Sequence, residues 1–159
     1  MFKDKNLFIT GGTGSIGNSI CHYFKNNGCK DIYASTTNIE KVNPNDKFIN
    51  YKQLNLSNIS ENNLDELLDM DVDYLILNAG VTKDNIFLRM SVEEWTDVID
   101  VNLNSSFYLL KHFIKKIAEI GVNKFIEIGP KKTLLNFIPK NFDAEKIFIT
   151  DNEDINSYV

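Results

Sequence analysis

Short apolar runs alternate with amphipathic segments along the chain. Four of these runs are predicted to be strands, and the first has the short, apolar character of a strand that is buried on both faces of a sheet. They are Leu7–Thr10, Asp31–Ser35, Phe48–Leu54 and Val72–Leu77. Helices are predicted between them at Ser15–Asn27, where the apolar residues have near-helical spacing, and at Ser60–Met70, which begins with a candidate N-cap. This alternation predicts an α/β fold with a doubly wound parallel sheet.

A long helix is predicted in the second half of the chain. Ser91, with Glu94 three residues later, has the pattern of a capping box. The helix is expected to continue to about Glu119 and to end at Gly121.

Further elements are predicted after this helix, with strands at Lys124–Ile128 and Lys146–Thr150 and a short helix at Thr133–Ile138. About six strands, in the order 3-2-1-4-5-6, would then form a single domain over residues 1–150. A join between two types of sequence is expected near residue 118. The polar residues 151–159 are expected to be frayed.

An asparagine falls among the apolar residues of the long helix. The apolar stripe consists of Trp95, Ile99, Leu103, Leu110, Ile114 and Ile117. At 100° per residue, Asn102 and Ser106 lie inside it. A buried amide without partners costs about 1–3 kcal/mol. Asn102 is therefore expected either to bond to a neighbouring strand or to order an active-site water or backbone segment.

The composition agrees with this fold class and excludes several functions. The 159 residues, 43% of them hydrophobic and 25% charged, suit one globular domain. A net charge of −5 without a basic stripe disfavours a nucleic-acid partner, and no apolar run approaches the roughly 20 residues of a membrane span. The N-terminus lacks the apolar region of an export signal, so a cytoplasmic protein is expected. Cys21 and Cys29 are expected to be reduced packing residues, and no metal site is expected.

Glycines after the first predicted strand have the spacing of a phosphate-binding turn. Gly11, Gly14 and Gly17 form the pattern G-x-x-G-x-x-G between a strand and a helix. Glycine permits the positive φ of a sharp turn and lets a pyrophosphate approach bare backbone. The start of the helix, at Ser15 and Ile16, adds unpaired N–H groups and the positive end of the helix dipole. We therefore predict a dinucleotide-binding turn, with an ordinary tight turn as the alternative.

The end of the second predicted strand bears on the choice of cofactor. A carboxylate there usually holds the ribose 2′-hydroxyl of NAD. This chain has Ala34-Ser-Thr-Thr-Asn38, with Thr36 at its centre and no carboxylate before Glu40. Hydroxyl groups carry no charge, so they do not repel the 2′-phosphate of NADP. Lys41 is near enough in the sequence to form an ion pair with that phosphate. NADP is the expected cofactor, and NAD is the alternative.

A stretch in the middle of the chain is more specific than the glycines. It reads Asn78-Ala-Gly-Val-Thr-Lys-Asp-Asn-Ile-Phe-Leu-Arg-Met90, and Val98-Ile-Asp-Val-Asn-Leu103 follows it. These residues resemble the short-chain dehydrogenase/reductase family, specifically the bacterial 3-oxoacyl-[acyl-carrier-protein] reductases, over about residues 5–117. The resemblance implies a truncated Rossmann-like reductase fold, NADP-dependent oxidoreductase chemistry, fatty-acid biosynthesis, and acyl carrier protein as a candidate partner.

The resemblance also assigns roles to individual residues. It places Asn102 in the catalytic tetrad, and it places these residues at the cofactor: Thr10, Gly11, Gly14, Ser15, Ile16, Gly17, Asn55, Asn78, Ala79 and Gly80. For Asn78, a turn-forming role before Gly80 is the alternative.

The chain departs from the family pattern at the cofactor site and in the residues that carry out the chemical step. Ser15 replaces a usual glycine, and Asn55 replaces a usual aspartate that contacts adenine. The family also uses a serine after the fifth strand and then Tyr-x-x-x-Lys, yet none of the 6 tyrosines has a lysine four residues later. Ketone reduction requires a proton donor to the developing alkoxide. Little or no ketoreductase activity is therefore expected.

The tail has a likeness of its own. Residues 118–150, and Gly121–Leu135 above all, resemble the C-terminal region of malonyl-CoA:[acyl-carrier-protein] transacylase without its serine elbow or its histidine. A fusion without a function of its own is therefore one alternative. A non-enzymatic partner of an intact reductase is another, and a third is an active reductase whose donor is Lys131, Lys132 or Tyr108.

The lack of the family's tyrosine-bearing helix has a consequence for the surface. That helix normally packs beside the long helix, so Phe107 and Phe113 are expected to be exposed. Exposed aromatic side chains predict self-association, and a homo- or hetero-oligomer is expected.

Overall fold

The structure is a computed structural model, which describes residues 2–60, 64, 69–119, 124–128, 136 and 145–149. It consists of two compact units, Met1–Ile117 and Ala118–Val159. Most of the helices predicted at Ser60–Met70 and Thr133–Ile138, and the whole tail at 151–159, lie outside the described residues. The prediction of a single domain with a join near residue 118 stays a prediction.

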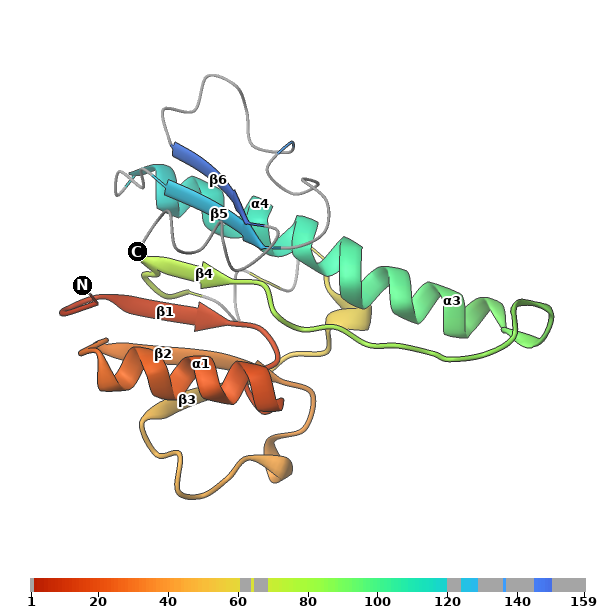
Figure 1. The fold of residues 1–159 in the computed structure, drawn as a ribbon, viewed down its shortest axis with the longest axis horizontal. Helices are drawn as coiled ribbons and strands as arrows, with labels where there is room; N and C mark the ends of the chain where they lie inside the picture. Colours follow the sequence, from red (N-terminus) through yellow and green to blue (C-terminus); the bar gives the residue numbers. More distant parts are fainter. Residues whose placement is uncertain are drawn as a thin grey trace. The chain divides into compact units, whose positions relative to one another are not determined.

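A four-stranded parallel sheet forms the centre of the first unit (Figure 1). Its strands are β1 (Asn6–Ile9), β2 (Asp31–Thr36), β3 (Ile49–Gln53) and β4 (Tyr74–Ile76). Their order in the sheet is β3-β2-β1-β4. The predicted α/β class and the predicted order of these strands are confirmed.

Helix α1 (Ser15–Asn26) covers one face of this sheet (Figure 1). Leu7 and Ile9 of β1 are fully buried, and they belong to one apolar cluster with Cys21 and Phe24 of α1. Leu7, Phe8 and Ile9 of this strand are apolar because neither face of the strand meets water there. Gly28, at φ +89°, follows the helix in the left-handed conformation that suits glycine.

Short 3-10 turns connect the outer parts of the first unit. They are η1 (Ile39–Lys41), η2 (Leu56–Asn58) and η3 (Phe87–Arg89). Asn38 and Asn55 cap the first two, since each side-chain oxygen accepts a hydrogen bond from the backbone N–H two residues later.

The predicted long helix is interrupted. Helix α3 (Val92–Ile99) begins at the predicted capping box, in which Ser91 Oγ accepts from Glu94 N and the Glu94 carboxylate accepts from Ser91 N. A π-helical turn follows at Asp100–Asn104, and α4 continues from Ser105 to Glu119. The predicted start and end of the long helix are therefore confirmed, while the π-helical turn within it was not predicted.

The π-helical turn changes which residues are buried. The wider turn rotates the following residues relative to regular 3.6-residue spacing. Four residues at a spacing of four therefore face inward: Val101, Ser105, Leu109 and Phe113. Trp95 and Leu103, from the predicted stripe, remain 55% and 42% exposed. Asn102 is exposed, so the expectation of a buried amide was wrong.

The two phenylalanines expected on the surface have different environments. Phe107 is 46% exposed, as expected. Phe113 is fully buried, and its ring centroid lies 5.3 Å from that of Phe8 on β1. The expectation for Phe113 was wrong because α4 packs this side chain against the sheet.

The second unit contains a parallel pair of strands. They are β5 (Lys124–Ile128) and β6 (Glu145–Ile149), and Lys124 is paired with Glu145 in their register. Both strands were predicted, with the second shifted by one residue, but they form a two-stranded sheet of their own, so the predicted order 3-2-1-4-5-6 holds for the first four strands alone.

No helix among the described residues is both long and apolar enough to cross a membrane.

Replacing Phe113 with alanine tests the register of α4. Loss of a fully buried ring next to Phe8 is expected to lower the free energy of unfolding by about 3–5 kcal/mol. The matched control is Phe107→Ala, which removes a half-exposed ring from the same helix and should cost less than about 1 kcal/mol. Urea denaturation measures both changes, and equal losses would contradict this packing.

Candidate functional site

The turn between β1 and α1 is built from close backbone contacts. Gly11 has φ +69°, and the N–H of Gly12 donates to the carbonyl of Ser35 over 3.0 Å. A Cβ added to Gly17 would lie 2.3 Å from the carbonyl oxygen of Gly11. This space admits no side chain, so the turn requires glycine at residue 17.

The N-terminus of α1 is open to an anion. Gly14 is the N-cap, no side chain accepts a hydrogen bond there, and the first turn carries no acidic residue. The first N–H groups of a helix lack partners within the helix, and the helix dipole adds positive potential at the same place. This arrangement is how helix termini bind phosphate groups.

Thr10 joins this turn to the end of β4. Its hydroxyl accepts hydrogen bonds from the backbone N–H groups of Asn78 and Ala79, each over 2.9 Å. The Asn78 amide in turn donates to the carbonyl of Thr10 over 3.0 Å. Thr10 is only 2% exposed, so its role is to hold the two loops together.

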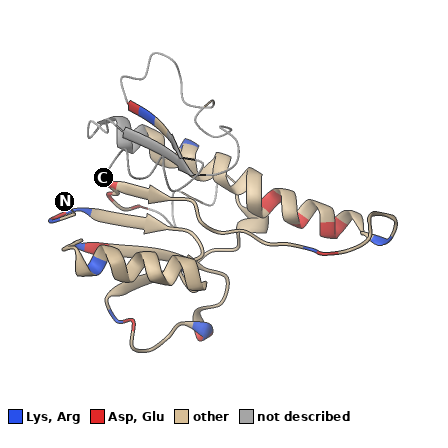
Figure 2. Cartoon of the chain, in the orientation of Figure 1, with Lys and Arg blue, Asp and Glu red and all other residues tan. Residues whose placement is uncertain are grey.

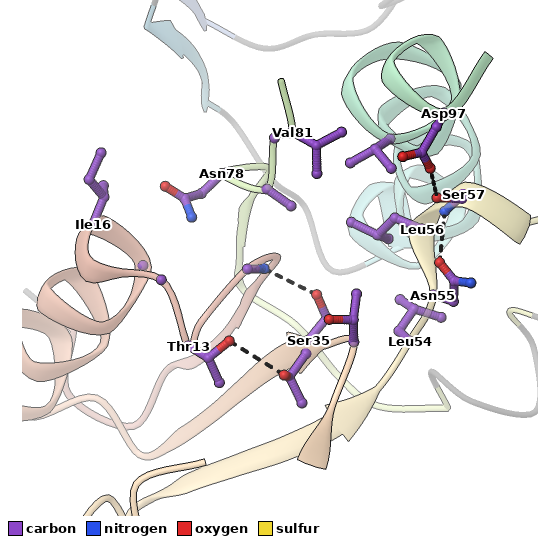
Figure 3. A pocket seen from close by; sticks show the side chains of 18 of the residues that line it. Thr13, Ile16, Ser35, Leu54, Asn55, Leu56, Ser57, Asn78, Val81 and Asp97 are labelled. Atoms are coloured by element: carbon purple, nitrogen blue, oxygen red, sulfur yellow. Dashed lines mark hydrogen bonds between the residues drawn. The ribbon is translucent and has the colours of Figure 1, made fainter. Parts of the chain in front are cut away.

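A cavity of about 510 Å³ opens beside these loops (Figure 3). This volume lies within the usual range for ligand pockets. The carboxyl ends of the parallel strands line it, as is usual for sheets of this type. In Figure 3, Ile16 and Asn78 lie on one side of the cavity, and Leu56, Ser57 and Asp97 lie on the other.

Hydroxyl groups gather at the end of β2. Ser35 Oγ accepts from the N–H of Gly11 over 3.2 Å. The hydroxyls of Thr13 and Thr36 are 3.4 Å apart, and Thr36 Oγ1 also donates to the carbonyl of Asn38 over 3.1 Å. This part of the cavity is therefore polar but uncharged.

The opposite part of the cavity is more apolar. Leu54 and Leu56 contribute from the end of β3 and from η2, and Val101 contributes from the π-helical turn. Asp97 is the only charged residue in the lining that the structure describes. The hydrogen bonds that Asp97 accepts from Ser57 and Lys83 hold the pKa of this carboxyl below its usual range.

Asn102 lies behind the cavity and fixes a loop. Its Oδ1 accepts from the N–H of Val81 over 2.8 Å, and its Nδ2 donates to the carbonyl of Val81 over 2.9 Å. Both polar ends of the side chain are thus occupied by one residue. Of the two roles expected for Asn102, ordering backbone is the one that these contacts support.

Most of the predicted site residues come together here. Every residue expected at the cofactor lines the cavity except Thr10, which immediately precedes the lining residue Gly11 in the sequence. Seven lining residues were not predicted from the sequence: Thr13, Leu54, Leu56, Ser57, Val81, Asp97 and Val101. Most of them flank the ends of the predicted strands, where a search of each strand end would have found them. Asp97 and Val101 belong to helical segments, so a search of the strand ends would not have found them.

The alternative proton donors are not all described. Lys131 and Lys132 lie outside the described residues. Tyr108, on α4, is partly buried and does not line the cavity. No donor is therefore seen beside the cavity among these candidates.

Comparison with known proteins decides the family. A model of the short chain dehydrogenase family matches residues 5–132. The chain belongs to this family. The match to the family model continues to residue 132, past the end of the resemblance seen in the sequence at about residue 117. The likeness of residues 118–150 to a transacylase stays a prediction.

Curated relatives include 3-oxoacyl-[acyl-carrier-protein] reductases. The protein from Salmonella typhimurium is 31% identical over 135 residues, which cover 80% of this chain and 55% of the relative. The protein from Rickettsia bellii is 37% identical over 129 residues, which cover 78% of this chain and 53% of the relative. The chain thus spans about half the length of the curated relatives that it matches.

Solved structures show the same fold. A short chain dehydrogenase from Leptospira borgpetersenii with bound NAD+ has a TM-score of 0.69 at 23% identity, over 80% of this chain and 52% of that one. The 2-keto-3-deoxy-D-gluconate dehydrogenase from Streptococcus agalactiae has a TM-score of 0.67 at 24% identity, over 84% of this chain and 56% of that one. Both likenesses support the Rossmann-like fold.

Alanine substitutions at two glycines test the turn. Gly17→Ala would place its Cβ 2.3 Å from a backbone oxygen, so it should displace the start of α1, destabilise the protein by about 1–3 kcal/mol and abolish nucleotide binding. Gly80→Ala is the control for stability alone, because its Cβ would meet Asn102 Oδ1 at an ordinary 3.5 Å while the residue itself lines the cavity. Thermal unfolding and NADPH fluorescence measure both effects. Normal binding by Gly17→Ala would refute the role of this turn.

Proposed function

We propose that this chain is an NADP(H)-binding domain related in function to 3-oxoacyl-[acyl-carrier-protein] reductases of fatty-acid synthesis. The observation that carries the proposal is the junction of the glycine turn, the uncapped N-terminus of α1 and Asn78 around one cavity. The identity with reductases of this class supports the same assignment.

The cavity offers a place for each part of a dinucleotide. The pyrophosphate would bind at the N–H groups of Ser15–Gly17, where no side chain intervenes. The adenosine ribose would lie at the end of β2, where members of this fold class hold it. The nicotinamide half would then reach Asn78–Val81, at the end of β4.

The hydroxyl groups at the end of β2 favour NADP over NAD. Thr13 and Thr37 present exposed hydroxyls there, and no carboxylate lines this part of the cavity in the described structure. A carboxylate would repel a 2′-phosphate, whereas hydroxyls can donate hydrogen bonds to it. Lys41, which is exposed in η1, supplies a positive charge on the following turn.

The chemical step lacks its usual proton donor. NADPH supplies a hydride when bound, and the developing alkoxide then requires a proton from the protein. None of the 6 tyrosines is followed by lysine at the fourth position, and the Asn102 side chain, which bonds to Val81, is a neutral amide without an acidic proton. We therefore infer that these 159 residues bind the cofactor with little or no ketoreductase activity.

Parallel titration with NADPH and NADH tests this proposal. NADPH fluorescence is expected to saturate in the micromolar range, with NADH weaker because the 2′-phosphate adds a hydrogen bond at the exposed hydroxyl of Thr37. Under saturating NADPH, a 3-oxoacyl thioester should be reduced several powers of ten more slowly than by an intact reductase. Tighter binding of NADH would overturn the choice of cofactor, and ordinary turnover would overturn the inference of impaired activity.

An exposed apolar surface supports the expectation of an oligomer. The segment Ile86–Leu88 projects side chains that are 64%, 81% and 93% exposed, and Val92 is 76% exposed. The segment is held in place, because Asn85 donates to Glu94 Oε2 over 3.1 Å and Met90 N–H donates to the carbonyl of Ile86 over 3.0 Å. A pre-ordered apolar surface of this kind is typical of protein–protein contacts.

We propose that this surface pairs with a second copy of the chain or with an intact reductase. Leu88→Asp, which places a charge in the contact, is expected to shift the protein from dimer to monomer in analytical ultracentrifugation without changing NADPH affinity. Thr82→Ser is the matched control in the same loop. A wild-type protein that is monomeric and does not copurify with an intact reductase would contradict the proposal.

A further inference from the structure

Three segments that are distant in sequence meet at Asp97, near the end of α3. The carboxylate accepts a short hydrogen bond from the hydroxyl of Ser57 in η2 (Figure 3). Its other oxygen lies 3.2 Å from Nζ of Lys83, in the loop after β4. We call these three residues the Asp97 clasp. It joins the loop after β3, the loop after β4 and helix α3.

The clasp holds the apolar wall of the cavity. The backbone N–H of Ser57 donates to Asn55 Oδ1 over 3.2 Å, and Leu56 between them is only 5% exposed. On the other side, Val101 follows Asp97 by one helical turn and lines the same cavity. The bond from Ser57 to Asp97 therefore fixes the separation of the two walls that carry Leu56 and Val101.

This wall faces one half of the proposed nucleotide. If the adenosine ribose lies at the end of β2, the base attached to it extends toward the end of the next strand, β3. A flat base requires two apolar walls at a fixed spacing, and Leu56 and Val101 supply such walls. The phosphate-binding turn and Asn78 lie on the opposite side of the cavity in Figure 3.

The clasp also controls the charge of the cavity. Asp97 is the one charged side chain among the described lining residues, and the ribbon of the glycine turn carries no charged residue in Figure 2. An unpaired carboxylate would repel an anionic nucleotide. The ammonium group of Lys83, which is itself outside the lining, neutralises it.

We propose that Asp97 is a positioning residue for the adenosine half of the cofactor, acting through Ser57 and Lys83. This inference rests on the proposed nucleotide binding. It requires no contact between Asp97 and the reacting atoms, and it predicts that loss of the clasp weakens binding of the adenosine half alone.

Binding of nucleotide fragments to variants tests the clasp. Ser57→Ala and Asp97→Ala are each expected to weaken NADPH and 2′,5′-ADP about 10-fold, while reduced nicotinamide mononucleotide binds as it does to the wild type. Asp97→Asn, which retains an acceptor for Ser57 but not the ion pair, should give an intermediate loss. Thr96→Ala, at an exposed neighbouring position on α3, is the matched control and should change nothing.

A second comparison isolates the charge. Lys83→Met leaves the carboxylate uncompensated, so NADPH affinity should fall more at low than at high salt. Adding Asp97→Asn to Lys83→Met should restore part of the affinity, because it removes the repelling charge. A double variant that binds no better than Lys83→Met would overturn the electrostatic part of the proposal.

The outcomes separate this inference from the proposed function. Failure of folded wild-type protein to bind either NADPH or 2′,5′-ADP would overturn both. Normal binding by the wild type and by Ser57→Ala would overturn the clasp alone. An equal loss for the nicotinamide fragment would show a general structural role and would also overturn it. Because Ser57→Ala removes one oxygen, it decides the question even if Asp97→Ala does not fold.

Discussion

The cavity depends on the buried hydroxyl of Thr10. It accepts two backbone hydrogen bonds from the segment after β4, while Thr10 itself leads directly into the glycine turn after β1. Because these two strands are adjacent in the sheet, one buried side chain fixes the separation of the two loops that would hold a dinucleotide. The close approach of Gly17 to the carbonyl of Gly11 then sets the start of α1 within this frame.

The glycine turn could be predicted from sequence because its causes are local. Positive φ at Gly11 and the lack of space at Gly17 follow from the geometry of a strand that turns sharply into a helix. The parallel sheet also followed from the alternation of apolar runs and helices, whereas the order of its strands rested on the family resemblance. The capping box at Ser91 was correct for the same reason, since it involves residues three positions apart.

Features that depend on packing between distant segments could not be predicted. The bond between Ser57 and Asp97 spans 40 positions and carries no sequence pattern. The π-helical turn at Asp100–Asn104 is invisible to an argument based on 100° per residue. It moves Asn102 out of the buried stripe to Val81, and it brings Phe113 against Phe8. Asn102 was thus singled out for a burial that it does not have, and its catalytic role stays a prediction.

We propose that this chain, which spans about half the length of its curated relatives, still forms a working nucleotide cavity. Amide hydrogen exchange with and without saturating NADPH tests this proposal most directly. Exchange is expected to slow at Ser15–Gly17 and at Asn78–Val81, with no change at Glu145–Ile149. Unchanged exchange at the glycine turn in a folded sample, or protection confined to other segments, would contradict it.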